Sequence, residues 1–250
     1  MKKLLGYCFT LPFLLVWFVL LNLFHVLQVV ARNTLGGAAH RKVVDGLNGC
    51  LIHSLALLGT HCSVRFAGPL PRGRPLIFVA NHQNKLDIVG ISWYLRRHQP
   101  IFVSKIELAS GIPSVSYNLR HSGAALIDRS DPRQALREIG RLGSRIEATQ
   151  GAAAIFPEGT RSTSGVIAPF QSAGVKILLK NAPDAIVVPI YIHDTWKVNR
   201  YGSFPMSFGE HLSWNVLPAI DPEGRSSGDV VAAAEAAIRS AQAQLTGGRC

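Results

Sequence analysis

The sequence predicts an α/β fold, with a mixed, mostly parallel sheet flanked by helices behind an apolar N-terminal anchor. Three short apolar runs, at residues 75–80, 152–156 and 185–192, are typical of strands buried on both faces. Residues 132–149 instead carry apolar side chains at helical spacing, after an Asp131-Pro132 pair suited to a cap and first turn. The core positions expected on this helix are Leu136, Ile139, Leu142 and Ile146. A second, alanine-rich amphipathic helix is expected over residues 226–245.

The N-terminal segment is long and apolar enough to enter a membrane. Residues 4–24 form an uncharged run that, as a helix, measures roughly 31 Å, about the hydrocarbon thickness of a bilayer. A cleaved signal peptide is the alternative, but its apolar region is usually only about 7–15 residues long, and no clear Ala-x-Ala site follows. We therefore expect the segment to be retained.

Basic residues flank this run on both sides, so charge does not select an orientation. They are Lys2, Lys3, Arg32, Arg41 and Lys42. The pattern favours a helical hairpin that enters one leaflet and returns, with residues 43–59 as a shorter amphipathic element. A single spanning helix is the alternative. We expect residues 1–60 to form the membrane-anchoring helices and residues 61–250 one α/β domain.

The first polar cluster, at residues 81–87, directly follows the apolar run at residues 75–80. Functional groups in α/β sheets lie where strands end at their carboxyl side. His82 offers an imidazole that can take a proton from a hydroxyl, provided that a group such as Asp87 fixes its tautomer and stabilises the cation. Five residues advance about 140° beyond a full helical turn, so the pair can meet only if His82 precedes the helix. Asn81 or His82 is then expected at the helix cap.

The second polar cluster follows the run at residues 152–156. Pro157 ends the strand, and Gly159 allows the backbone to approach a ligand closely. Arg161 presents a planar set of donors that matches a phosphate, and Thr160 adds a neutral donor. A plain surface turn, with Glu158 paired to Arg161, is the alternative reading.

Taken with two further blocks, these clusters resemble the membrane glycerolipid acyltransferases, specifically the bacterial 1-acylglycerol-3-phosphate acyltransferases. The matching blocks are Asn-His-x4-Asp at residues 81–87, Gly-x-x-x-Ile-x-Arg at 123–129, Phe-Pro-Glu-Gly-Thr-Arg at 156–161 and Val-Pro-Ile at 188–190. A lysine-glutamate segment at residues 103–108 lies between the first two. Four blocks in order are specific where one alone would not be. The resemblance covers about residues 65–220.

The resemblance implies a sheet of seven or so strands and transfer of an acyl group from acyl-CoA or acyl-ACP to lysophosphatidic acid, giving phosphatidic acid. His82 would act as general base on the free sn-2 hydroxyl and Asp87 would orient it, with no acyl-enzyme and no bound cofactor. The residues implied for phosphate binding are Arg129, Glu158, Gly159, Thr160 and Arg161, with Asn81, Lys105 and Pro189 in support. Because a carboxylate repels phosphate, Glu158 is expected to orient Arg161 or an acceptor hydroxyl. Pro189 is expected at a bulge or an edge position that shapes the pocket.

Two positions depart from the family pattern. Leu126 replaces a usual aromatic residue, which preserves apolar packing. Gln171 stands where a lysine usually follows Pro-Phe, so one cationic contact to the phosphate is in doubt, and Lys176 or Lys105 could supply it.

The formal charge of +11 favours anionic partners. Nucleic acid is not expected, because the charge is scattered rather than gathered on one helix or strand. Membrane lipid, together with coenzyme A or an acidic acyl carrier protein, fits better. The four cysteines form no Cys-x-x-Cys pair, so neither a metal site nor a disulfide framework is expected. These features suit the cytoplasmic face of the inner membrane.

Two other functions compete with this reading. The acceptor could be a different lysolipid, such as a lyso-ornithine lipid or a lysophospholipid, since relatives share the blocks. In another class, the chain could be a non-catalytic, membrane-associated lipid-binding protein. The intact His82, Asp87 and Arg161 argue against the second.

Overall fold

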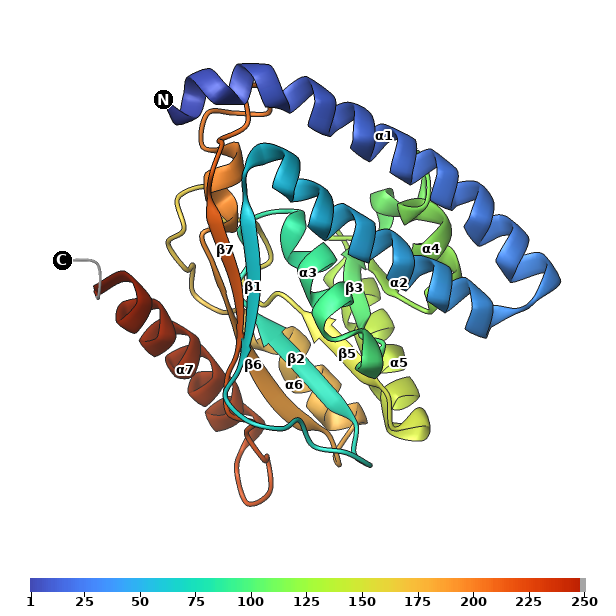
Figure 1. The fold of residues 1–250 in the computed structure, drawn as a ribbon. Coiled ribbons are helices and arrows are strands. Elements are labelled where there is room, and N and C mark those ends of the chain that lie inside the picture. Colours follow the sequence, from blue (N-terminus) through green and yellow to red (C-terminus); the bar gives the residue numbers. More distant parts are fainter. Residues whose placement is uncertain (248–250) are drawn as a thin grey trace.

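The computed structural model describes residues 1–247 and has a seven-stranded sheet at its centre (Figure 1). The strand order is β1-β7-β6-β2-β5-β3-β4, and every neighbouring pair is parallel except β6 with β7. The strands are β1 (His61–Phe66), β2 (Leu76–Ala80), β3 (Ile101–Lys105), β4 (Ala125–Ile127), β5 (Ala152–Ile155), β6 (Ile186–His193) and β7 (His211–Val216). The predicted mixed, mostly parallel sheet is therefore confirmed.

The three central strands are the ones that the sequence marked as apolar runs. Every residue of β2, β5 and β6 is buried, because helices cover both faces of the sheet. Leu76 of β2 is in register with Ala152 of β5 and with Ile186 of β6. The carboxyl ends of these strands therefore lie side by side, and the loops that leave them converge.

Helices occupy both faces of the sheet (Figure 1). The α-helices are α1 (Lys2–Thr34), α2 (Gly37–Ser54), α3 (Leu86–Tyr94), α4 (Val115–Ser122), α5 (Pro132–Thr149), α6 (Ser172–Asn181) and α7 (Ser227–Gly247). Short 3-10 helices are η1 (Leu55–Leu58), η2 (Arg96–His98), η3 (Ile106–Ala109) and η4 (Thr195–Asn199). Alternate residues of β2 face opposite ways: Phe78 packs with α2 and α3, and Ile77 with α5, α6 and α7.

Helix α5 matches its predicted bounds, and its predicted cap forms. The Asp131 side chain accepts a hydrogen bond from the Gln134 amide at 2.9 Å. Ile139, Leu142 and Ile146 are buried, as expected. The prediction for Leu136 is wrong, since this side chain is 36% exposed, in a surface groove between α5 and α6.

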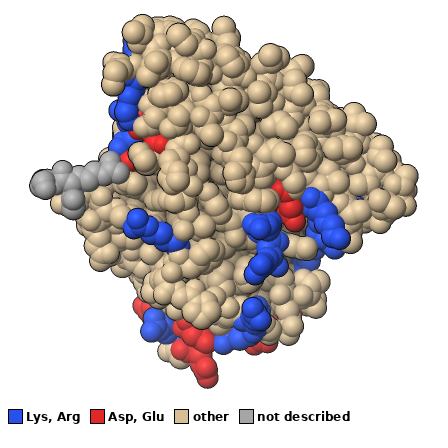
Figure 2. All heavy atoms as spheres, viewed as in Figure 1, with Lys and Arg blue, Asp and Glu red and all other residues tan. Residues whose placement is uncertain are grey.

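The N-terminal helix is longer than the apolar run from which it was predicted. Helix α1 has 33 residues and is the one described helix long and apolar enough to cross a membrane. Helix α2 begins at Gly37, earlier than the expected start at residue 43, and packs against α1 as a hairpin. Large apolar side chains are exposed along α1, and the surface there is free of charged side chains between its ends (Figure 2). This face is suited to lipid.

Helix α1 is also fixed to the sheet side of the molecule. The Met206 amide donates to Thr10 Oγ1 at 2.9 Å, and Lys2 Nζ lies 3.1 Å from Glu210 Oε2. Side chains of α1 and α2, including Phe13 and Leu51, share one core cluster with β2 and β6. The hairpin therefore lies along the domain, as Figure 1 shows.

Pro189 does not lie on an edge strand, so that part of its prediction is wrong. Strand β6 lies between β2 and β7, and Pro189 pairs with Val79 in the parallel ladder. On its other side the antiparallel ladder is interrupted between Ile190↔Val216 and the bridge Val187↔Ile220. The missing amide hydrogen of proline is tolerated because it falls in this interruption.

Candidate active site

Three loops that leave the carboxyl ends of β2, β5 and β6 meet at one edge of the sheet. The loop after β2 carries His82, the loop after β5 carries Glu158, and Thr195 follows β6. Two backbone contacts fix the first two loops: the Ser162 amide donates to the His82 carbonyl at 2.8 Å, and the His82 amide donates to Glu158 Oε1 at 2.6 Å. The first two loops are therefore held together by their own hydrogen bonds.

His82 and Asp87 are in contact, as the spacing required. Their Nδ1 and Oδ2 atoms are 2.8 Å apart, and His82 lies in the loop before α3. The predicted cap is wrong, because the N-cap residue is Lys85. Asp87, in the first turn, reaches back with Oδ2 to accept the amides of Gln83 (2.5 Å) and Asn84 (2.8 Å). The short loop thus bends around the carboxylate.

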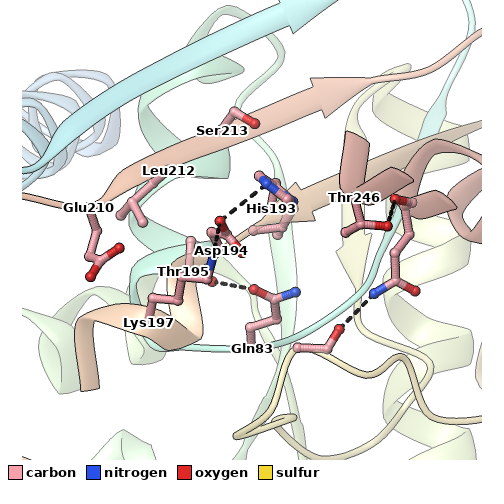
Figure 3. A network of polar contacts seen from close by, with 12 residues as sticks. Gln83, His193, Asp194, Thr195, Lys197, Glu210, Leu212, Ser213 and Thr246 are labelled. Atoms are coloured by element: carbon pink, nitrogen blue, oxygen red, sulfur yellow. Dashed lines mark hydrogen bonds and ion pairs between the residues drawn. The ribbon is translucent and has the colours of Figure 1, made fainter. Parts of the chain in front are cut away.

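Asp87 has a further partner that sequence reasoning missed. Thr195 Oγ1 donates to Asp87 Oδ1 at 2.6 Å, and both residues are 0% exposed. The hydroxyl also lies 3.3 Å from Gln83 Oε1, and Figure 3 shows this contact next to Asp194, which lies between His193 and Lys197. Thr195 is 108 positions from Asp87 along the chain, so no local pattern indicates the contact.

The imidazole of His82 is held from a second direction by an aromatic ring. Phe156 stacks on it with ring centroids 4.1 Å apart and an interplanar angle of 18°. The His82 side chain is 13% exposed. With Nδ1–H directed at Asp87, Nε2 is the ring nitrogen that can accept a proton.

Asn81 holds the end of β2 to β6. Its Nδ2 donates to the Ile192 carbonyl at 2.9 Å, and its Oδ1 accepts the Ile192 amide at 2.7 Å. This side chain is completely buried and imitates one more residue of the ladder. Asn81 therefore fixes the position of the backbone at the start of the loop that carries His82.

Both carboxylate oxygens of Glu158 accept hydrogen bonds from backbone amides. Oε1 accepts the His82 amide, and Oε2 accepts the Ala168 amide at 2.7 Å. Burial raises the pKa of Glu158, while the two amide hydrogen bonds oppose that shift. The carboxylate is thus part of the support for the histidine loop.

A cavity of about 2140 Å³ opens beside His82 and is lined by most of the expected phosphate-binding side chains. Arg129, Thr160, Arg161 and Lys105 all line it. Gly159 has φ +69, and an added Cβ would lie 3.2 Å from Gln171 Nε2, so the turn favours glycine. Lys176 is on α6, where its Nζ is 3.7 Å from the Cβ position at Gly228 of α7. Lys105, not Lys176, therefore faces the cavity.

Lys85 is a cavity cation that was not among the predicted site residues. Its Nζ lies 5.6 Å from the ring of Trp17 on α1. Burial, and then the like charge of Arg161, lower the pKa of Lys85. Two cations placed close together favour an anion between them.

The described residues offer no group of three or more His, Cys, Asp or Glu side chains able to hold a metal ion. Cys8, Cys50 and Cys62 are free thiols, and Cys250 lies outside the described residues. Burial raises the pKa of Cys62 to about 12, so it is unsuited to act as a nucleophile.

Comparison with known proteins agrees with this arrangement. The model of the family described as Acyltransferase matches residues 61–193. The chain is 24% identical over 185 residues to 1-acyl-sn-glycerol-3-phosphate acyltransferase alpha of Ovis aries (74% of this chain, 63% of that one). It is 29% identical over 182 residues to the beta protein of Homo sapiens (73% and 64%). The chain thus spans slightly less than two thirds of these relatives.

A solved structure, that of the 1-acyl-sn-glycerophosphate (LPA) acyltransferase PlsC from Thermotoga maritima, has the same fold. The TM-score is 0.77 at 24% identity, with 97% of each chain covered. The match therefore includes the N-terminal hairpin as well as the sheet. Since the family model covers more than half of the sequence, this chain belongs to the Acyltransferase family.

Proposed function

We propose that this protein transfers an acyl group from a thioester to the sn-2 hydroxyl of 1-acylglycerol-3-phosphate, giving phosphatidic acid. The observation that carries the proposal is the 2.8 Å contact between His82 and Asp87 at the wall of a cavity rich in cations. The relatives bear the name of this activity, and the site offers chemistry that fits it.

In the proposed reaction, Nε2 of His82 takes the proton from the acceptor hydroxyl as its oxygen attacks the thioester carbonyl. Asp87 stabilises the imidazolium through Nδ1–H. When the carbon–sulfur bond breaks, the thiolate leaves and takes the proton back from His82. The ester is formed in one transfer, so no side chain is acylated. Asn81, Phe156 and Thr195 keep the imidazole and carboxylate in position for both proton transfers.

We assign the acceptor phosphate to Arg129, Thr160 and Arg161, assisted by Lys85 and Lys105. All five line the cavity with His82, and guanidinium groups bind phosphate through paired, charge-assisted hydrogen bonds. Gly159 supplies the turn, and Glu158 supports the loop that carries His82. Pro189 shapes the strand behind the site and takes no part in chemistry.

We further propose that residues 1–60 hold this site at the cytoplasmic face of the inner membrane as a hairpin in one leaflet. The exposed apolar face of α1 and its contacts with the domain support this arrangement. Either acyl-CoA or acyl carrier protein, both water-soluble, could then deliver the thioester. Protease treatment of sealed vesicles checks the topology, because an N-terminal tag on the face opposite the domain would exclude a hairpin.

The deciding experiment measures acyl transfer from a labelled thioester to a panel of lysolipids by purified protein in detergent. We expect selective use of lysophosphatidic acid, with a loss of at least about 100-fold in His82→Ala. His211→Ala, which removes an exposed histidine of β7 outside the cavity, is the matched control.

Two outcomes would revise the proposal in different ways. Transfer to a lyso-ornithine lipid or a zwitterionic lysolipid would keep the mechanism and change the acceptor. Full activity in His82→Ala would contradict the mechanism itself.

A further inference from the structure

The cavity that contains His82 has a second polar region, where buried side chains lack partners. Gln28 of α1 is 0% exposed and His40 of α2 is 2% exposed, and both line the cavity. Among residues 1–247, no group bonds to Gln28 Nε2, Gln28 Oε1 or His40 Nε2. Nearly all buried polar atoms in folded proteins are hydrogen-bonded, so three unpaired atoms on one cavity wall call for a ligand.

Three helices build this wall, and their contacts hold it in place. His40 packs edge-on against Tyr117 of α4, with ring centroids 5.7 Å apart, and Tyr117 stacks on His121 at 4.2 Å. Helix α4 is fixed to α1 by Ser114, whose Oγ donates to the Leu21 carbonyl at 2.7 Å and whose amide donates to His25 Nδ1 at 3.3 Å. The unpaired atoms therefore belong to a packed wall and not to a mobile surface.

The charges around this wall favour an anion. Burial lowers the pKa of His40, and the positive charges of His121, Arg32 and Arg41 lower it further. Arg32 and Arg41 also line the cavity, and Asp45 is the one carboxylate in its described lining. An anionic group would relieve the repulsion among these cations.

The hydrogen-bonding groups narrow the anion to a class. The Gln28 amide leaves a donor and an acceptor unused, which together suit a hydroxyl group, and the guanidinium groups suit a phosphate. Apolar side chains of the same two helices, Leu21, Val44 and Leu47, also line this cavity, so an acyl chain can lie against them. A hydroxylated phosphate carried on an acyl chain is the headgroup of an anionic glycerophospholipid.

We propose that Gln28, His40, Arg32 and Arg41 form a second lipid site, which binds the glycerophosphate headgroup of an anionic phospholipid. It lies between α1, α2 and α4, whereas the residues assigned to the reacting acceptor lie at the carboxyl end of β3 and on the loops after β2, β4 and β5. Both sites open into the same cavity. A lipid bound at the second site would therefore lie on the side of the cavity entrance that faces the membrane. The inference rests on the proposed function only in that the protein works on membrane lipid.

The test measures binding, not catalysis. The full chain, purified in an uncharged detergent, is titrated with short-chain phosphatidylglycerol, phosphatidylcholine or inorganic phosphate. Thermal unfolding and native mass spectrometry report the midpoint shift and the bound lipid. We expect phosphatidylglycerol to bind and raise the midpoint. Gln28→Leu, His40→Phe and Arg41→Gln should each weaken this binding at least tenfold.

Matched variants separate this site from general effects. Asn22→Leu makes the same kind of change on the exposed side of α1, and Lys42→Gln removes a charge next to Arg41 but outside the cavity lining, so both should bind as the wild type does. Gln28→Leu replaces the unpaired buried atoms with apolar ones, and Arg41→Gln changes an exposed side chain. If one of these variants fails to fold, the other still tests the site.

Several outcomes would overturn the proposal. Equal binding of phosphatidylcholine would remove the requirement for an anion, and saturation by inorganic phosphate alone would make this a free-anion site. Binding that survives in Gln28→Leu and Arg41→Gln but is lost in Arg161→Gln would assign the lipid to the reacting site. Repeating the titration in His82→Ala separates the two proposals, because binding there does not depend on acyl transfer.

Discussion

The two polar regions of the cavity differ in how their buried atoms are satisfied. Around His82, the carboxylate of Asp87 receives hydrogen bonds from the imidazole, two backbone amides and the Thr195 hydroxyl. Around Gln28, three buried atoms have no partner within residues 1–247. The hydrogen bonds of the first region are therefore complete within the protein, whereas those of the second would be completed by the lipid headgroup that we propose.

The difference follows from the elements that build each region. Loops leaving β2 and β5 have backbone amides outside helices and strands, and these amides donate hydrogen bonds to Asp87 and Glu158. Helices α1 and α2 use their own amides in intrahelical bonds, so a buried side chain between them depends on other side chains or on a ligand. A loop edge is therefore suited to hold a fixed catalytic group, and a helical wall to accept an exchangeable headgroup.

Removing the charge of Asp87 should have the largest effect. In Asp87→Asn the side chain keeps its size but no longer stabilises an imidazolium, and we expect acyl transfer to fall roughly 10²–10⁴-fold. Steady-state rates with lysophosphatidic acid measure the loss, and circular dichroism checks that the fold is intact. A folded variant with wild-type turnover would show that the hydrogen bonds around His82 and Asp87 have a structural role only.

Removing the Thr195 hydroxyl should have a smaller effect of the same kind. Thr195→Val keeps the shape but leaves Asp87 Oδ1 without its donor, and a hydrogen bond to a charged group contributes about 1.5–3 kcal/mol. We expect kcat to fall about 10–100-fold and KM for both substrates to stay the same, because Thr195 contacts Asp87 and not substrate.

Thr195→Ser is the control for this prediction, since it retains the hydroxyl and should recover most of the rate. If valine and serine reduced kcat equally, the methyl group and its packing would be responsible. A change in KM alone would mean that Thr195 acts on substrate binding.

Asp194, which neighbours Thr195, should stabilise the fold in a pH-dependent way. Although burial opposes it, hydrogen bonds from His193 and Lys197 lower the pKa of Asp194 from 3.8 to about 2. Because the folded-state pKa is depressed, the ionised carboxylate stabilises the fold above about pH 4, and this contribution of about 2 kcal/mol is lost as pH falls toward 2.

Denaturant unfolding of the wild type and Asp194→Asn between pH 2 and pH 6 measures this contribution. Asparagine tolerates the positive φ of 64 at this position, so the substitution changes the charge and not the backbone. The gap in unfolding free energy should close as pH falls, while Glu223→Gln at an exposed turn should give no such closure. A gap that stays constant with pH would contradict the assignment.

Around His82, the sequence predicted the contacts between residues that are close together in the chain. His82 and Asp87 are five residues apart, and the apolar runs before His82 and Pro157 indicated two strand ends. Thr195 and the Glu158 contacts join segments far apart in the chain, and nothing in either segment alone specifies the pairing. The spacing of residues along the chain predicts contacts within one loop, whereas the order and register of the strands decide which loops come together.

The helical parts show the same limit. The uncharged run at residues 4–24 predicted that α1 exists, but not that it continues to Thr34 with Gln28 buried on its inner side. Leu136 had the right period for a core position but is partly exposed, in a surface groove that it shares with Ile177, Lys180 and Asn181 of α6. Periodicity identifies one face of a helix, but not how completely its neighbours cover that face.

The smallest predicted effect has the opposite sign from the others. Gln28→Leu replaces unpaired buried polar atoms with apolar ones, so in lipid-free detergent we expect the free energy of unfolding to stay the same or rise by up to about 1 kcal/mol. Thr195→Val, which breaks a formed bond, should lower it under the same conditions. Thermal and denaturant unfolding of both variants compare the two regions directly. A loss of more than about 1 kcal/mol in Gln28→Leu would mean that the protein itself satisfies this amide, and the two regions would then be alike.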